Sequence, residues 1–294
     1  MNYPEKLDLH MHSTVSDGTD TPEELLAHVR EAGIGIFSIT DHDAVRSSEI
    51  IGDLLKKGDP LFIPGSEFSC KDEHGKYHIL GYGYDNKAQA IRQLVMKAHE
   101  NRMSKVWDRL DALESVYGVV FPEEEIMKLL ARSNPGKPHM GNLMVQYGYA
   151  ETKEIAIEQF IDTLPVKARY IRPEEAIRAI LESGGVPVLA HPSYGSGSQR
   201  ITGKDMEDRL KRLMDLGLQG VEAYYSQFTE DLVEELKALA VRYDLYVTAG
   251  SDYHGKNKKN ALGYTRLSAV SEGPAGLRRF LDRVLGSGQN GSGI

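Results

Sequence analysis

Short apolar runs alternate with amphipathic segments along the first 85 residues of the chain. Runs typical of strands are followed by segments with the 3.6-residue spacing of helices. The predicted strands are 7–11, 34–40, 61–66 and 77–84, and the predicted helices are 21–32 and 45–57. The first helix has a marked start, because Thr21-Pro22-Glu23-Glu24 combines a capping hydroxyl, a proline for the first turn and two acids. This order predicts a β-α-β arrangement.

The same alternation returns after residue 172. Predicted helices cover 172–184, 205–216 and 231–243, and predicted strands cover 186–190, 221–225 and 245–249. Between the two halves, helical patterns follow one another without a strand over 95–117, 123–131, 139–147 and 153–160. We therefore expect an α/β protein with a parallel, helix-covered sheet or barrel, interrupted by a helical insertion.

Three regions follow from this order. Residues 1–94 and 169–285 are expected to form the sheet or barrel, and residues 95–168 a helical insertion. Residues 286–294 consist mainly of glycine and serine and are expected to be a flexible tail.

Composition excludes several classes of protein. Hydrophobic residues make up 40% of the chain and charged residues 27%, which is typical of a globular protein. The apolar stretches are far shorter than the ~20 residues of a membrane span, and the N-terminus lacks the pattern of a secretory signal, so we expect a cytoplasmic protein without membrane contact. A net charge of −8 disfavours a broad basic face for long nucleic acids. The composition carries no signal for the oligomeric state.

Histidines and acids gather at or near the ends of predicted strands. In a strand, residues two apart point to the same side, so His10 and His12 should face one pocket, and Asp252 and His254 should do the same. The single cysteine rules out a thiolate site, so any metal must use imidazole and carboxylate ligands. Such ligands suit Mn, Fe or Zn. The full set, which exceeds the need of one ion, is His10, His12, Asp17, His42, Glu67, His78, His191, Asp252 and His254.

These motifs resemble the polymerase and histidinol phosphatase (PHP) superfamily of metal-dependent phosphoesterases. The resemblance rests on Asp8-Leu9-His10-Met11-His12-Ser13-Thr14-Val15-Ser16-Asp17-Gly18, Ile39-Thr40-Asp41-His42-Asp43, Gly65-Ser66-Glu67, His78, Ala190-His191-Pro192 and Gly250-Ser251-Asp252-Tyr253-His254. The layout is similar to the stand-alone bacterial branch of 3′,5′-nucleotide bisphosphate phosphatases and 5′-to-3′ exonucleases. It implies a distorted (β/α)7 barrel whose helical insertion caps the substrate.

The resemblance also implies two to three divalent ions. His10, His12, Glu67 and Asp252 would hold the first ion; Glu67, as a bridge, with His78 and His191 the second; and Asp17, His42 and His254 the third. A hydroxide between the first two ions would attack the phosphorus of a small nucleotide-like or sugar-phosphate substrate, such as a nucleoside 3′,5′-bisphosphate. Residues expected to carry catalysis are Glu67, His191, Asp17 and His42, and the sequence identifies no general acid.

Candidate substrate contacts lie in and beside the insertion. Lys137 and His139 stand at a loop that enters a helix, which is a place where phosphate binds readily. The family segment usually offers arginine where this chain has Lys137, and lysine binds phosphate as a point charge only. Arg169 near the return to the barrel and Tyr194 after His191 are the other candidates, for closing the pocket and for contacting a base or sugar.

Other functions remain open from the sequence. A cyclic ribose-phosphate phosphodiesterase uses the same metal core, and an exonuclease acting at the 5′ end of short RNA needs no long basic track. An amidohydrolase-type deaminase or lactonase also begins with a His-x-His motif, but it leaves Asp17, His42 and His254 unexplained. A non-catalytic, metal-stabilised scaffold is the alternative outside enzymes.

Overall fold

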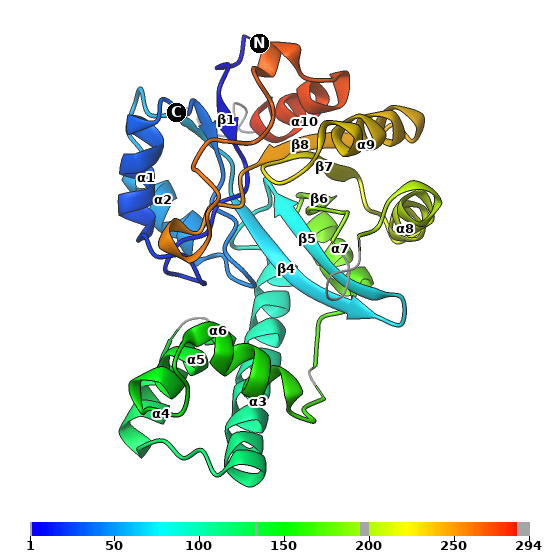
Figure 1. The fold of residues 1–294 in the computed structure, drawn as a ribbon. Helices are drawn as coiled ribbons and strands as arrows, with labels where there is room; N and C mark the ends of the chain where they lie inside the picture. Colours follow the sequence, from blue (N-terminus) through cyan, green and yellow to red (C-terminus); the bar gives the residue numbers. More distant parts are fainter. Residues whose placement is uncertain (1, 133–134, 168, 195–199, 287–294) are drawn as a thin grey trace. The chain divides into compact units, whose positions relative to one another are not determined.

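The computed structural model describes residues 2–132, 135–167, 169–194 and 200–286 (Figure 1). The chain divides into two compact units. Unit 1 comprises Met1–Val95 and Ile171–Ile294, and unit 2 comprises Met96–Tyr170. The predicted tail lies outside the described residues except for Gly286, which is the last residue of a helix.

Unit 1 alternates strands and helices. Its strands are β1 (Leu7–Asp8), β2 (Ile36–Phe37), β3 (Leu61–Phe62), β4 (Gly65–Asp72), β5 (Gly75–Tyr82), β6 (Val186–Leu189), β7 (Gly220–Tyr225) and β8 (Tyr246–Gly250). Its helices are α1 (Pro22–Glu31), α2 (Arg46–Leu54), α7 (Pro173–Glu182), α8 (Gly203–Asp215), α9 (Glu230–Arg242) and α10 (Ala275–Gly286), with short 3-10 turns η3 (Gly255–Asn257) and η4 (Val270–Glu272). Helix α10 was not predicted from the sequence.

The strands form two sheets that join at both edges. Strands β1, β2 and β3 are parallel, and β4 to β8 form a second sheet in chain order. Beyond the regular strands, Met11 pairs with Tyr253, and His42 pairs with Glu67. The Leu9 N–H donates to the Ala249 carbonyl at 3.0 Å and the Asp43 N–H to the Glu67 carbonyl at 2.9 Å. These bonds close the sheets into an α/β barrel, which leaves few unpaired strand edges.

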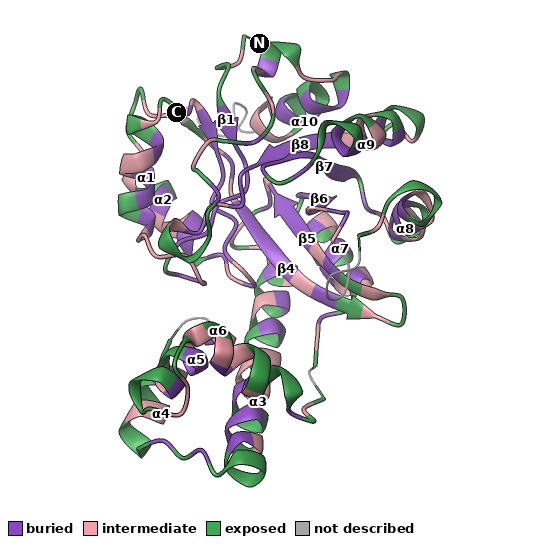
Figure 2. Ribbon diagram, viewed as in Figure 1, coloured by how far each residue is buried: buried purple, intermediate pink, exposed green. Residues whose placement is uncertain are grey.

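Burial follows the hydrophobic pattern. Figure 2 shows most strand residues buried, the outer end of the hairpin between β4 and β5 partly exposed, and the helices exposed on their outer faces. Helix α1 begins as predicted, because the Glu24 N–H donates to Thr21 Oγ1 at 3.2 Å and the Thr21 N–H to Glu24 Oε2 at 2.8 Å. It packs Leu25 and Val29 against the apolar residues around β2.

The sequence predicted a parallel sheet or barrel, but part of the second sheet is antiparallel. The predicted strand 61–66 is divided between β3 and β4, and β4 continues to Asp72 and forms an antiparallel hairpin with β5. Strand β5 also pairs antiparallel with β6. The outer part of the hairpin carries Lys71, Asp72 and Lys76, whose polar pattern hid the strands. Glu67 therefore lies inside a strand and not after its carboxyl end.

Unit 2 consists of helices joined by loops, with no strand among its described residues. It contains most of α3 (Gln89–Tyr117), then α4 (Glu123–Leu130), α5 (Lys137–Gln146), α6 (Lys153–Ile155), the π-helix η1 (Ala156–Phe160) and the 3-10 helix η2 (Ile161–Thr163). Helix α3 begins in unit 1, earlier than the predicted 95. A core that includes Leu113, Met140 and Met144 holds the helices of this unit together. In the part of the chain that the structure describes, no helix combines the length and apolar character of a membrane span.

Candidate metal centre

Glu67 lies at the centre of a group of imidazoles in unit 1. Its carboxylate is buried, and its two oxygens face different partners. Oε1 lies 2.9 Å from His78 Nδ1 and 3.0 Å from His191 Nε2. Oε2 lies 3.3, 3.2 and 3.2 Å from nitrogens of His10, His12 and His42. This arrangement would allow one carboxylate to serve two ions.

Two further acids complete the group. Asp252 Oδ1 lies 3.6 Å from His10 Nε2, 3.4 Å from His12 Nε2 and 3.4 Å from His254 Nδ1. Asp17 Oδ1 lies 3.3 Å from His254 Nε2. The structure thus brings together all nine predicted ligands from the two ends of the chain and the segments between them.

The local backbone explains how the side chains meet. Met11 is fully buried beside Tyr253, so its neighbours His10 and His12 both face the opposite side. Asp252 and His191 have positive φ angles of 56° and 25°, which are uncommon for residues other than glycine. The Asp252 N–H donates to the His10 carbonyl at 2.8 Å, which keeps it at this turn. Such backbone strain is often found at functional sites.

The donor atoms fit a group of divalent cations. His10 Nε2, His12 Nε2 and His254 Nε2 are buried and make no hydrogen bond within the described residues. Each nevertheless lies 3.2–3.3 Å from a carboxylate oxygen. Two donors bonded at about 2.1 Å to one ion are separated by roughly this distance, and imidazole with carboxylate suits Zn, Mn or Fe. The atoms within 4.8 Å of one another form three groups: His12, Asp17, His42 and His254; His10, His12, Glu67 and Asp252; and His42, Glu67 and His78.

The electrostatics favour cation binding in competition with protons. Burial alone would raise the pKa of Glu67, but the imidazoles of His78, His42 and His10 hold it well below its usual range. Burial would lower the pKa of His12, but Asp252 and Glu67 raise it to about 9. In the absence of metal His12 therefore retains a proton that a cation must displace on binding, whereas burial lowers the pKa of His42 to about 3 and leaves that imidazole neutral. The affinity for metal should consequently rise with pH.

One side of the group is open to solvent. The side chains of His10, His12 and Asp252 are 0–3% exposed, whereas His78 and Asp17 are 34% and 32% exposed. A substrate would therefore approach the ions beside His78 and Asp17.

Several residues that support the ligands were missed by the sequence analysis. Tyr225 donates its hydroxyl proton to Asp252 Oδ2 at 2.9 Å, and Lys258 Nζ lies 2.7 Å from the same oxygen. Glu222 contacts His10 Nδ1 at 2.9 Å. Asp41, which the sequence motif already contained, accepts a hydrogen bond from Ser16 Oγ at 2.6 Å. The only signal for Glu222 was a lone acid within the apolar run of β7.

The predicted substrate residues lie in different settings. Tyr194 lies three residues after His191 in unit 1, where the two ring centroids are 5.9 Å apart, and its hydroxyl donates to Gln227 Oε1 at 3.2 Å. The other three belong to unit 2. Lys137 forms an ion pair with Asp162, Arg169 is exposed, and His139 Nδ1 accepts a hydrogen bond from the Gly136 N–H at 3.2 Å.

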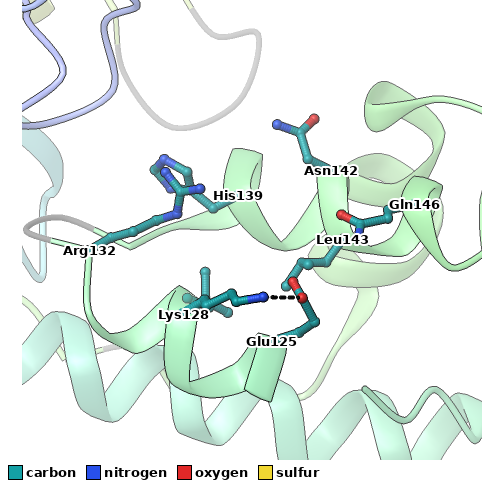
Figure 3. A pocket seen from close by; sticks show the side chains of 8 residues that line it. Glu125, Lys128, Arg132, His139, Asn142, Leu143 and Gln146 are labelled. Carbon is teal, nitrogen blue, oxygen red and sulfur yellow. Dashed lines mark hydrogen bonds and ion pairs between the residues drawn. The ribbon is translucent and has the colours of Figure 1, made fainter. Parts of the chain in front are cut away.

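His139 also lines a cavity of about 140 Å³ between α4 and α5 (Figure 3). Within it, Lys128 is ion-paired with Glu125 at 3.0 Å. The lining residues are Glu125, Lys128, Leu129, Arg132, His139, Asn142, Leu143 and Gln146. The lining is thus mixed, because Leu129 and Leu143 lie beside the polar and charged side chains.

The fold and the site define a class of protein: an α/β barrel with histidines and acids grouped to hold divalent cations. Residues 8–166 match the PHP domain model, and the chain belongs to the PHP domain family. It is a metal-dependent phosphoesterase. The resemblance inferred from the motifs and the α/β barrel are both confirmed.

Curated relatives span the chain at modest identity. A phosphoribosyl 1,2-cyclic phosphate 1,2-diphosphodiesterase of Eggerthella lenta is 31% identical over 85% of this chain and 94% of the relative. The 5′-3′ exoribonuclease Rnm of Salmonella typhimurium is 28% identical over 86% of each chain. A 3′,5′-nucleoside bisphosphate phosphatase of Chromobacterium violaceum is 26% identical over 84% of this chain and 87% of the relative.

A similar structure has been solved for a protein of Bifidobacterium adolescentis assigned as a metal-dependent phosphoesterase. It superposes with a TM-score of 0.75 at 26% identity and covers 94% of this chain and 96% of its own. The likeness therefore extends over both units of the fold.

Proposed function

We propose that the protein hydrolyses a phosphate ester of a small ribose-containing substrate, with a nucleoside 3′,5′-bisphosphate as the leading candidate. The observation that carries this proposal is the position of Glu67, whose two oxygens face separate sets of imidazoles. Phosphate monoesters and diesters are anions that repel nucleophiles, so a site rich in cation ligands suits them.

The proposal includes two to three divalent ions, Mn, Fe or Zn. His10, His12 and Asp252 with Glu67 Oε2 would hold the first, and His78 and His191 with Glu67 Oε1 the second. Asp17, His42 and His254 would hold the third. When bound, such ions neutralise phosphate charge and lower the pKa of water at the site.

The chain's own residues prepare this site. Glu67 and His191 are proposed to be essential ligands at its centre, with Asp17 and His42 at the side that borders the exposed surface. Tyr225 and Lys258 occupy Asp252 Oδ2, so that Oδ1 is directed to the imidazoles. A carboxylate with one oxygen held in this way has little freedom to rotate, which keeps the ligands in place.

Recognition of the substrate is assigned to four residues. Tyr194 is proposed to contact the base or the sugar, because its ring lies beside that of His191. Lys137 and His139 are proposed to contact phosphate, and Arg169 is proposed to close the pocket. Lys137 would have to exchange its ion pair with Asp162 for the substrate anion.

Two other substrates have specific support. The 31% identical relative acts on a cyclic ribose phosphate, and a lysine at 137 in place of arginine is compatible with a diester of lower charge. The 28% identical relative is an exoribonuclease, which supports short RNA with a 5′ phosphate as a third candidate.

One substrate panel separates these candidates. Mn-replete protein is incubated with nucleoside 3′,5′-bisphosphates, 5′-phosphorylated short RNA and a ribose cyclic phosphate, with the Glu67→Gln variant as the control. A bisphosphatase releases inorganic phosphate, a cyclic diesterase opens the ring without releasing phosphate, and an exonuclease produces mononucleotides. Hydrolysis of ring amides or lactones, with every phosphate ester left intact, would contradict the proposal.

A further inference from the structure

A buried acid that is not among the candidate ligands contacts two of them. Glu222 is the third residue of β7 and is fully buried. Its Oε1 lies 2.9 Å from His10 Nδ1, and its Oε2 accepts a hydrogen bond from the His191 backbone N–H at 2.8 Å. A buried carboxylate is costly unless its oxygens are satisfied, and here both are used. The two histidines face opposite oxygens of Glu67.

The contact with His10 determines which of its nitrogens is free for a cation. A carboxylate only accepts hydrogen bonds, so His10 Nδ1 must carry the proton. In the neutral ring that binds a cation, the lone pair is then on Nε2, which is the buried nitrogen that faces Glu67 and Asp252 at 3.3 and 3.6 Å. A histidine ligand is commonly fixed in this way by an acceptor on its second nitrogen.

The contact with His191 supports an unusual backbone conformation. His191 has a φ of 25°, a backbone angle that residues other than glycine rarely adopt. The Glu222 carboxylate holds the N–H of this residue while its Nε2 lies 3.0 Å from Glu67 Oε1. The direction of the His191 side chain therefore depends on the same group as the tautomer of His10.

The barrel leaves space for this arrangement at Gly250. A Cβ atom at position 250 would lie 2.6 Å from Glu222 Oε1 and closer still to His10 Cβ. Gly250 has no positive φ that would require glycine. Its lack of a side chain instead leaves room for the contact between Glu222 and His10.

We propose that Glu222 is a positioning residue that couples the two halves of the metal centre. One carboxylate selects the His10 tautomer that presents Nε2 and fixes His191 on the other side of Glu67. This inference rests on the metal centre of the proposed function and deepens it. It does not depend on which phosphate ester is the substrate.

The substitution Glu222→Gln tests the proposal with almost no change in volume. An amide offers one oxygen, so it cannot accept from both His10 and the His191 N–H. If its oxygen stays on His191, the amide NH2 faces His10 Nδ1 and the proton of His10 moves to Nε2. If the amide turns over, the His191 N–H faces a donor. We expect the affinity for Zn, measured by competition with a chelator, to fall about 10- to 100-fold.

The tautomer gives a second readout that a merely structural role would not change. In ¹⁵N histidine spectra of the full-length, Zn-loaded protein, the His10 signals should have the Nδ1–H pattern in the wild type. They should change to the Nε2–H pattern, or become heterogeneous, in Glu222→Gln. The control is Glu24→Gln, which replaces a carboxylate at the cap of α1 and should leave both readouts as in the wild type.

The outcomes are separable. Wild-type Zn affinity together with the wild-type tautomer in Glu222→Gln would overturn the proposal, even if the melting temperature fell. Should this variant not fold, Glu222→Asp decides, because it keeps both acceptors on a shorter arm. A loss of Zn affinity in Glu222→Asp, smaller than the 10- to 100-fold loss expected for Glu222→Gln, then supports the proposal. An unchanged Zn affinity overturns it. If the wild type binds Zn but hydrolyses no phosphate ester, the proposed function fails while the Glu222 result still stands.

Discussion

Replacement of Tyr225 by phenylalanine removes one hydrogen bond from Asp252 and little else. The Tyr225 hydroxyl donates to Asp252 Oδ2 at 2.9 Å, and both residues are buried. Its ring packs against Phe228 and His191 with centroid distances of 5.0 and 5.5 Å, and phenylalanine would keep these contacts. A hydrogen bond to a charged group contributes about 1.5–3 kcal/mol. Because Lys258 Nζ remains 2.7 Å from the same oxygen, we expect the lower end of this range.

Urea unfolding of the metal-free protein measures this effect, and the competition with a chelator measures its consequence for metal binding. We expect Tyr225→Phe to lower the free energy of unfolding by about 1.5 kcal/mol and to weaken metal binding about 10-fold. Tyr246→Phe is the matched control, since the Tyr246 hydroxyl makes no hydrogen bond within the described structure and should change neither value by much. A Tyr225→Phe variant whose free energy of unfolding lies within about 0.5 kcal/mol of the wild-type value would refute the reasoning.

Three further predictions concern the ligands, the ions and a helix cap. Glu67→Gln should reduce turnover by more than about 100-fold and lower the bound metal measured by elemental analysis; full activity with full metal content would contradict the role of Glu67. Removal of metal by a chelator should abolish phosphoester hydrolysis and lower the melting temperature. Metal at about 100 times its Kd adds about 2.7 kcal/mol per site to the free energy of unfolding. An unchanged melting temperature would argue against ions at the buried site. Thr21→Ala should cost about 1 kcal/mol in urea unfolding without altering metal affinity, because it removes only the cap of α1.

Much of the fold was accessible from local pattern. The periodicity predicted the β-α rhythm, and the capping residues gave the start of α1 within one residue. The α/β barrel and the phosphoesterase class, both of which the motifs implied, are confirmed by the comparisons. The helices of the insertion were predicted as well, although α3 begins earlier and 153–160 ends in the turn η1.

Two elements of the fold were not predicted correctly, the hairpin of β4 and β5 and helix α10. The hairpin of β4 and β5 depends on pairing between the two strands, and polar residues can occupy its solvent-exposed end at little cost. The outer part of β4 therefore lacked the apolar run by which strands were recognised, whereas most of β5 was predicted as the strand 77–84. Helix α10 packs Leu277 and Phe280 into the core, yet the sequence analysis proposed no element there.

The sequence by itself determined the chemistry of the site: imidazoles and acids, with one cysteine, at spacings that direct His10 and His12 to one side. Tertiary structure alone decided how these groups are supported. Glu222, Tyr225 and Lys258 approach the ligands from distant segments, and no local pattern specifies a contact across 212 residues, such as that of His10 with Glu222. Local periodicity reports which face of an element is buried. Only closure of the barrel determines which residues meet there, because that depends on the pairing of all its strands.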